Sequence, residues 1–231
     1  MLRLVAVMDP LAATEADLAA FLASHVGLKP ESRKSMQASL RSFYAWAADR
    51  GLIDSNPSTG LRNVQTPPGV PRPIAQAALR QALADAGEEA TLMLLLGAYA
   101  GLRRSEIARV HSDDFDGLAL TVLGKGGRVR RIPTHPMLGG RLAQLDGWAF
   151  PSPVRTGRPV TADYVSDRLG RILPAPYTPH SLRHYFGTMA YRGSHDLRAV
   201  QTLLGHARPE TTARYVLVDE DSLTAAVLAV A

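Results

Sequence analysis

Helical spacing of apolar residues dominates the first quarter of the chain. From Glu15 to Val26 and again from Glu31 to Asp49, apolar residues recur every three or four positions, which predicts two helices that each bury one face. The expected buried positions are Leu18, Phe21, Leu22, Val26, Met36, Leu40, Phe43 and Ala47. Phe43, Tyr44 and Trp46 lie on or beside the second stripe, so all three are expected in the core rather than on a base-stacking surface.

A proline-rich stretch follows this helical part. Pro67, Pro68, Pro71 and Pro73 stand within seven positions, and each proline removes an amide donor and restricts the backbone. Neither a helix nor a central strand is expected to pass through them. The pattern therefore predicts a helical domain over residues 1–65, a linker over 66–73 and a second domain over 74–231.

The second domain combines helices with one hairpin. Helices are expected over Ile74–Ala86 and Glu88–Tyr99, and strands over Leu118–Leu123 and Val129–Pro133, joined by a turn that carries Lys125 between glycines. Later helices are expected to start with Thr178 as cap and Pro179 as first residue, and to run from Ser194 to a left-handed cap at Gly205. The predicted fold class is mainly α with a small β-hairpin, in two domains.

Composition limits the functional classes. The apolar content of 46% supports a buried core, and the net charge of +5 with a pI near 9.8 favours a polyanionic partner without identifying it. The absence of cysteine excludes disulfides, thiolate zinc sites and a cysteine nucleophile, which fits a reducing cytoplasm. The apolar run from Leu4 to Met8 is too short for a signal peptide or a membrane span, so a cytoplasmic protein is expected.

Candidate chemistry is spread over the second domain. Arg103 and Glu106 are three residues apart, close enough for the carboxylate to orient the guanidinium, although such a pair can also be an ordinary surface ion pair. The helix predicted to start at Pro179 places His180 and Arg183 near its positive end, where an anion is favoured. His180 and His184 have the spacing of a zinc pair, but there is no HExxH glutamate between them and Arg183 would repel a cation. No metal or cofactor is therefore expected.

Five motifs occur in a fixed order: Gly101-Leu102-Arg103-Arg104-Ser105-Glu106-Ile107, the Gly-Lys-Gly hairpin at Lys125, His180-Ser181-Leu182-Arg183-His184, Leu203-Leu204-Gly205-His206, and Thr211-Thr212 with Tyr215. Each motif alone has a simpler explanation, such as a solvated lysine, a structural His206 or a packed Tyr215. Together they closely resemble the tyrosine recombinase (phage integrase) family.

This resemblance implies a role for each matching residue. Arg103 and Arg183 are expected to clamp the scissile phosphate, Lys125 to act as general acid and Tyr215 as nucleophile. His180 and His206 match two further phosphate-facing positions. Glu106 and His184 match supporting positions.

The resemblance also implies a DNA-binding role for the first domain, as a helical core-binding (SAM-like) domain. Further phosphate contacts are expected from the face of the second helix that carries Arg33, Lys34 and Arg41 with Gln37, although on its own this face is more simply explained as a solvated one. Phosphate contacts are also expected from Arg128, Arg130 and Arg131 in the hairpin. No arm-binding domain is expected ahead of a helix that begins near Glu15. The apolar tail from Asp219 to Ala231 is expected to be exchanged between protomers of a homo-tetramer on DNA, with packing on its own core or a degradation signal as alternatives.

The predicted function is site-specific recombination of double-stranded DNA through a 3′-phosphotyrosyl intermediate, for integration of a phage or mobile element. Because the phosphotyrosyl ester retains the energy of the broken bond, the reaction needs no ATP. A type IB topoisomerase and a catalytically silent DNA-binding regulator are the two alternatives.

Overall fold

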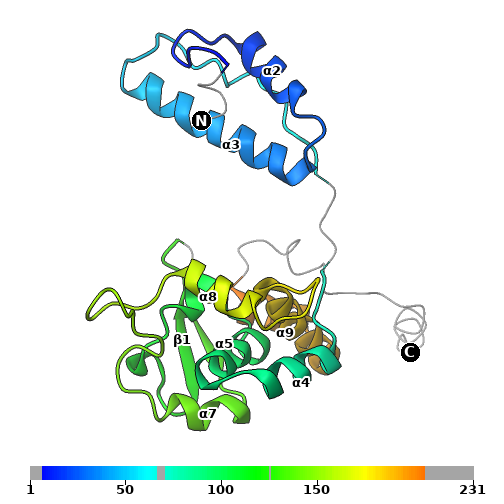
Figure 1. Ribbon diagram of the computed structural model, residues 1–231, viewed down its shortest axis with the longest axis vertical. Helices are drawn as coiled ribbons and strands as arrows, with labels where there is room; N and C mark the ends of the chain where they lie inside the picture. Colours follow the sequence, from blue (N-terminus) through cyan, green and yellow to red (C-terminus); the bar gives the residue numbers. More distant parts are fainter. Residues whose placement is uncertain (1–6, 67–70, 125, 206–231) are drawn as a thin grey trace, which may run out of the picture. The chain divides into compact units, whose positions relative to one another are not determined.

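The computed structural model describes residues 7–66, 71–124 and 126–205 (Figure 1). Two compact units make up the chain, residues 1–69 and 70–231, and the division falls within the proline-rich stretch. In the described residues the regular elements are helices apart from one antiparallel pair of strands. The predicted mainly helical fold with a small sheet is therefore confirmed. No described helix is long and apolar enough to cross a membrane.

The first unit is built on two helices, α2 (Glu15–Ser24) and α3 (Pro30–Asp49). Thr14 caps α2: its Oγ1 accepts from the Asp17 amide at 3.3 Å, and its own amide donates to the Asp17 carboxylate at 2.9 Å. Pro30 occupies the first position of α3, where its missing amide hydrogen costs nothing. The two apolar stripes meet in a core formed by Leu18, Phe21, Leu22, Leu40, Tyr44 and Leu61.

Two apolar positions of this unit were predicted wrongly. Helix α2 ends at Ser24, so Val26 lies beyond the helix and is exposed. Trp46 is also exposed, whereas Tyr44 is fully buried and Phe43 is partly buried against the core. The reason is the helical period: Tyr44 lies four residues after Leu40 on the buried stripe, and Trp46 is turned by about 200° from it.

The polar face of α3 is only partly exposed to solvent. Gln37 is buried, and its side chain binds the following chain segment at both ends, donating to the Arg62 carbonyl at 2.6 Å and accepting from the Val64 amide at 3.0 Å. Arg41 donates to the Leu61 carbonyl at 2.5 Å and to the Asn63 side chain at 2.7 Å. The prediction that Gln37 belongs to an outward phosphate-tracking face is therefore wrong, because this side chain binds Arg62 and Val64 to the helix.

In the second unit, α5 (Glu88–Tyr99) is the central helix, with α4 (Gln76–Asp85) before it and α9 (Pro179–Ser194) packed against it. Seven consecutive residues of α5, from Leu92 to Ala98, are buried, as expected of a helix that is apolar all round. A side-chain carbon added at Gly97 would lie 2.9 Å from Leu182, so this glycine permits the close approach of α9.

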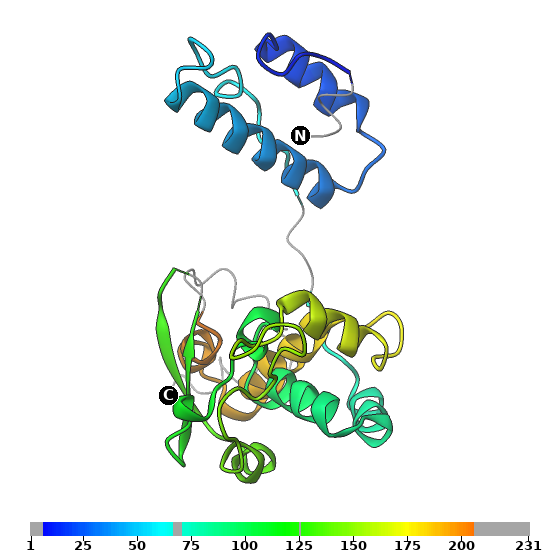
Figure 2. The same ribbon diagram turned by 60° about the vertical axis from the view of Figure 1, so that its left-hand side comes forward.

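The strands β1 (Ala119–Leu123) and β2 (Val129–Pro133) form the predicted antiparallel hairpin, with Val122 opposite Arg130. Along β2 the side chains alternate, so that Arg130 and Ile132 are buried while Val129 and Arg131 are exposed. In Figure 2 the hairpin is the green ribbon beside α10 (Leu197–Leu204), and β2 and α10 are in contact.

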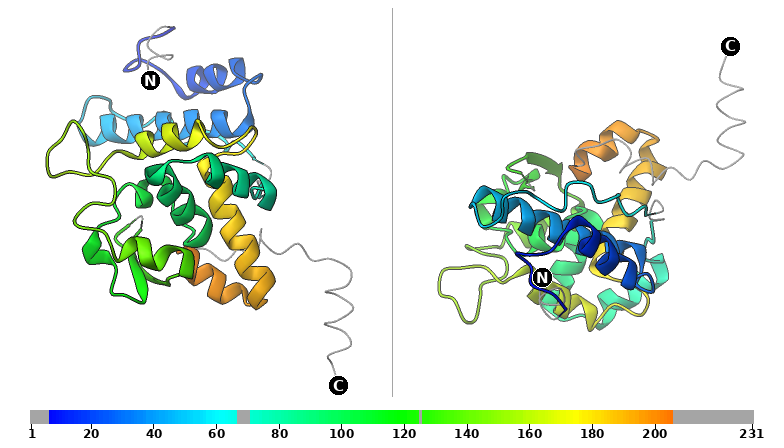
Figure 3. Two further views of the ribbon diagram at one scale, coloured as in Figure 1. Left: turned by 60° about the horizontal axis from the view of Figure 1, so that its bottom comes forward. Right: turned by 90° about the horizontal axis from the view of Figure 1, so that it is seen from above.

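The junction between α9 and α10 differs from the prediction. Helix α9 continues to Ser194, His195 takes a left-handed conformation with φ of 51°, and Asp196 caps α10 by accepting from the Ala199 amide. A helix start at Ser194 was therefore predicted too early. Val200 and Leu204 pack α10 back onto α9, as the adjoining gold and orange helices in Figure 3 show. Gly205 forms the predicted left-handed cap, with φ of 62°.

Two further helices, α7 (Pro136–Leu142) and α8 (Ala162–Gly170), are not among those predicted from the hydrophobic pattern. Both begin at a residue whose side chain accepts a backbone amide, His135 for α7 and Thr161 for α8. Helix α8 packs on α5 and on the one-turn helix α6 (Arg104–Ile107), which carries the first arginine motif.

Candidate active site

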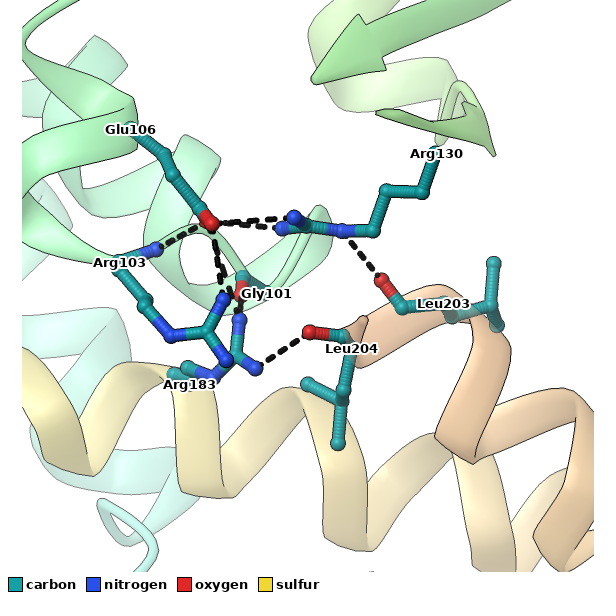
Figure 4. Close-up of polar contacts among 7 residues, drawn as sticks. All are labelled: Gly101, Arg103, Glu106, Arg130, Arg183, Leu203 and Leu204. Carbon is teal, nitrogen blue, oxygen red and sulfur yellow. Dashed lines mark hydrogen bonds and ion pairs between the residues drawn. The ribbon is translucent and has the colours of Figure 1, made fainter. Parts of the chain in front are cut away.

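A sharp turn between α5 and α6 positions the first arginine. Gly101 has φ of +64°, and Phe186 of α9 lies so close that a side-chain carbon at this position would clash. Arg103 caps α6, and Glu106 reaches back to it: the Arg103 amide donates to Oε2 and the Arg103 Nη1 donates to Oε1, both at 2.8 Å (Figure 4). The expected Arg103–Glu106 pair is thus formed, and it is part of a buried cluster rather than a surface ion pair.

The second arginine comes from the first turns of α9. This helix starts as predicted, with Thr178 at the cap and Pro179 at its first position, and the Thr178 amide donates to Ser181 Oγ at 3.2 Å. Arg183 is 1% exposed. Its guanidinium donates to the Gly101 carbonyl and to the Leu204 carbonyl, each at 2.5 Å, and lies 3.9 Å from Glu106 Oε2. Burial of this cation is tolerated because oxygen atoms surround it.

Glu106 is the common partner of these cations. Burial alone would raise its pKa, but the hydrogen bonds from Arg130 and from the Arg103 amide, together with the charges of both guanidiniums, lower the pKa of Glu106 to about 2. The carboxylate is therefore ionised at neutral pH. It holds Arg103 in one orientation and faces Arg183, so the elements α6 and α9 present two guanidiniums beside one fixed anion.

Arg130 points into the protein, whereas a contact to a DNA phosphate requires an accessible side chain. Its side chain is buried, its Nη1 and Nη2 donate to the two oxygens of Glu106 at 3.0 and 2.7 Å, and its Nε donates to the Leu203 carbonyl at 2.9 Å. The expectation that Arg130 anchors DNA is therefore wrong, because these donors are engaged inside the protein. The strand alternation contained the signal: if Ile132 points inward, so does Arg130.

The two histidines of α9 contact each other through their rings. The rings of His180 and His184 lie 4.2 Å apart between centroids in an edge-to-face arrangement. Although part of His180 is exposed, desolvation of its ring lowers the pKa, and the charges of Arg183 and Arg103 lower it further. This favours a neutral imidazole at physiological pH. Within residues 7–66, 71–124 and 126–205, no three His, Cys, Asp or Glu side chains gather closely enough to hold a metal ion.

The remaining basic candidates lie on surfaces. Arg128 and Arg131 of the hairpin are exposed, and Arg131 pairs with Asp116, whose pKa this contact and backbone amides lower to about 2. In the first unit Lys34 is exposed and Arg33 is half-buried. Three candidates of the predicted site, Lys125, His206 and Tyr215, lie outside the described residues.

The phage integrase family model matches residues 74–221, which cover this helical unit and its arginine cluster. The second unit therefore belongs to the class of integrase-type domains. The chain is 34% identical to tyrosine recombinase XerC of Xylella fastidiosa (strain 9a5c), over 93% of this chain and 80% of that protein. It is also 34% identical to XerC of Rhodospirillum centenum, over 92% and 69% of the two chains.

Solved structures agree with this assignment. The integrase from mycobacterium phage Brujita aligns with a TM-score of 0.56 at 27% identity, over 90% of this chain and 74% of that one. The XerH recombinase bound to its difH substrate has the same fold, with a TM-score of 0.68 at 21% identity over 94% and 70%. The chain belongs to the phage integrase family of tyrosine recombinases, and it is a site-specific recombinase enzyme.

Proposed function

We propose that this enzyme cleaves and rejoins DNA strands through a covalent bond between Tyr215 and a 3′ phosphate. The observation that carries the proposal is the fixed carboxylate of Glu106, which holds Arg103 at 2.8 Å and lies 3.9 Å from Arg183. Two guanidiniums beside one carboxylate suit the non-bridging oxygens of a phosphodiester, because a guanidinium carries planar paired donors. Arg183 donates to the Gly101 and Leu204 carbonyls in this structure, so the proposal requires it to exchange one of these acceptors for the phosphate.

The chemistry follows from the charge that develops at phosphorus. The Tyr215 oxygen attacks in line, a bond forms between this oxygen and phosphorus, and the bond to the 5′ oxygen breaks. Arg103 and Arg183 stabilise the negative charge of the transition state. Lys125 gives its proton to the departing 5′ oxygen, and a 5′ hydroxyl of another strand reverses the same step.

His180 is proposed as the acceptor of the tyrosine proton. A phenol has an ordinary pKa of about 10 and is a weak nucleophile at neutral pH. The pKa of His180 is lowered, so this imidazole is neutral and has a lone pair to accept the proton. After accepting it, the imidazolium lies beside the phosphate that the arginines hold, where its positive charge is favourable.

The proposed partner is double-stranded DNA, bound by both units. The solved XerH and lambda integrase structures are complexes with a difH substrate and a COC′ core site, which supports a DNA partner for this chain. We assign core-site binding to the helical first unit, in which Arg33, Lys34 and Arg41 are proposed to contact the DNA backbone. We assign further phosphate contacts to Arg128 and Arg131 of the hairpin. Assembly as a tetramer with exchange of the tail remains a prediction, since residues 206–231 lie outside the described part.

Integration of a phage or mobile element is one biological role of such chemistry. The relatives named above include XerC proteins of bacteria as well as a phage integrase, so similarity supports recombination as such and not integration in particular. We keep integration as a prediction, to be tested by sequencing the products formed between plasmids that carry the selected site.

The covalent step is directly testable. Duplexes that the protein retains from a random-sequence library identify its site, and a nicked suicide version of that duplex traps the adduct on a denaturing gel. We expect Tyr215→Phe to bind the duplex as tightly as the wild type and to form no adduct. Adducts that persist in the variant contradict the assignment of Tyr215.

The same material separates the alternatives. A topoisomerase is indicated if the protein relaxes supercoiled plasmid without recombinant product, at a rate per enzyme molecule that does not depend on enzyme concentration. Specific binding by a well-folded wild type that never yields an adduct on the suicide duplex indicates a silent regulator. Recombinant product that requires Tyr215 supports the proposal.

A further inference from the structure

Arg130 occupies a position that strands normally give to an apolar residue. It lies on the inward face of β2, two residues before Ile132 and opposite the buried Val122 of β1. Removing a guanidinium from water is costly unless hydrogen bonds and a counter-charge replace the solvent. A residue that only filled this position would be better as leucine or valine, so the buried arginine calls for an explanation.

The contacts of Arg130 join three elements. Its fork donates to both carboxylate oxygens of Glu106 on α6, and its Nε donates to the Leu203 carbonyl near the end of α10, while its own backbone belongs to β2 (Figure 4). The last carbonyls of a helix lack partners within the helix and favour a cation. Arg183 donates to the next of these carbonyls, that of Leu204.

The geometry at Glu106 depends on both sides of its carboxylate. Arg103 binds it from α6 through the backbone amide and Nη1, and Arg130 binds the same two oxygens from the hairpin. With both partners present, the plane of the carboxylate has one orientation. Without Arg130 it would be free to rotate toward Arg183, which now lies 3.9 Å away, and to compete with the phosphate for the donors of that guanidinium.

We propose that Arg130 is a positioning residue for the cleavage reaction: it holds Glu106 so that Arg103 and Arg183 remain oriented and their donors remain available to the phosphate. This inference rests on the proposed function of the two arginines. It assigns to the hairpin a second task besides carrying Lys125, namely to fix the arginine cluster and the end of α10 from the opposite side.

A comparison of two substrates tests this role. The first is the suicide duplex with an ordinary scissile phosphate, and the second carries a methylphosphonate there, in which a methyl group replaces one charged oxygen. Arg130→Met is expected to slow single-turnover cleavage of the phosphate substrate at saturating duplex by about 10- to 100-fold, as for residues that orient an active-site group. On the neutral substrate the arginines have less charge to stabilise, so we expect a loss at least about tenfold smaller.

The control is Val122→Ala. It creates a cavity at the cross-strand partner of Arg130 and destabilises the hairpin without removing a contact to Glu106. If Arg130 has only a structural role, Arg130→Met loses rate by the same factor on the two substrates, as Val122→Ala does. This result overturns the inference. If Arg130→Met does not fold, Arg130→Lys serves instead, because lysine keeps the charge but cannot bind both carboxylate oxygens and Leu203.

The outcomes for the inference and for the proposed function are distinct. A wild type that cleaves neither substrate refutes the proposed function. If the wild type cleaves both substrates and the Arg130 variant loses rate by the same factor on each, only the positioning role is refuted. A loss concentrated on the charged phosphate supports it.

Discussion

Basic side chains are held differently in the two units. Around Glu106 in the second unit, Arg103, Arg130 and Arg183 share a buried carboxylate, and the last two are themselves buried. On α3 of the first unit, Arg41 instead binds the Leu61 carbonyl and the Asn63 side chain at a partly open face, and Lys34 is exposed.

This difference supports the separate roles that we propose for the two sets of basic side chains. Buried cations with fixed partners cannot reorient at the moment of reaction, which is the property that transition-state stabilisation requires. Exposed cations remain hydrated and screened by salt, so they contribute to affinity for DNA without fixing the geometry of a reacting group. A change in the first set should therefore alter cleavage, and a change in the second should alter binding.

The largest expected effect is that of Arg183→Lys. Lysine keeps the charge but loses the planar fork, and by comparison with the loss of one oxyanion donor we expect cleavage to fall about 10²- to 10³-fold. Binding of the duplex should weaken much less. Single-turnover rates at saturating duplex and equilibrium binding measure the two quantities. Arg192→Lys, an exposed position on the same helix, is the matched control, and equal losses in rate and affinity would contradict the separate roles.

Glu106→Gln tests the carboxylate itself. The lowered pKa, about 2 against an ordinary 4.5, corresponds to about 3 kcal/mol of stability at neutral pH. Glutamine also points amide hydrogens at guanidiniums. We expect urea denaturation at pH 7 to show a loss of this order, and the exposed Glu88→Gln at the start of α5 to show little change.

The pH dependence gives a second measurement of the same residue. Because the pKa of Glu106 is lowered in the folded protein, its contribution is fully present above the unfolded value near 4.5 and is lost as the pH falls through about 2. The difference in unfolding free energy between the wild type and Glu106→Gln should therefore shrink between pH 4.5 and 2. A constant difference across this interval would show that the stabilisation does not come from ionisation.

A smaller effect is expected at Gly97, which lets α5 and α9 approach where Leu182 precedes Arg183. Alanine here places a carbon 2.9 Å from Leu182. Overpacking costs about 1–3 kcal/mol, and the better helix propensity of alanine returns about 1 kcal/mol, so we expect a net loss of about 1 kcal/mol in unfolding free energy. Gly193→Ala lies in the same helix as Leu182 with open space around it, and it should stabilise the protein. If both substitutions stabilise, the close approach at Gly97 does not constrain the site.

The sequence predicted the elements of this site better than their contacts. Local signals, such as Thr178 with Pro179 at the start of α9 and Gly205 at the end of α10, predicted those helix ends correctly. Spacing also predicted the Arg103–Glu106 contact, because residues three apart in a helical turn are neighbours.

Contacts between distant segments could not be predicted in this way. The bonds from Arg130 to Glu106 and to Leu203 span 24 and 73 residues, and they depend on how the hairpin packs against α6 and α10. The alternation along β2 places Arg130 on the same side as Ile132, but its charge led to the prediction of a surface position. The buried carboxylate that explains the inward position lies on another element, α6. Likewise, Gln37 is polar yet buried, because the carbonyl and amide that it binds come from the segment after the helix.

The smallest expected effect, and the sharpest test of the first unit, is Lys34→Ala. Its exposed side chain is proposed to contact a phosphate, so its removal should weaken binding by a similar factor on every duplex and reduce the slope of log affinity against log salt by about 1. Cleavage at saturating duplex should not change, because no reacting group depends on Lys34. Arg50→Ala removes the same charge just beyond the other end of α3 and controls for net charge. If Lys34→Ala slows cleavage at saturating duplex, the exposed cations of α3 take part in the reaction together with the buried cluster. If Arg50→Ala lowers the salt slope equally, these cations act only through the overall charge. Either result contradicts the proposal that they form a separate binding surface.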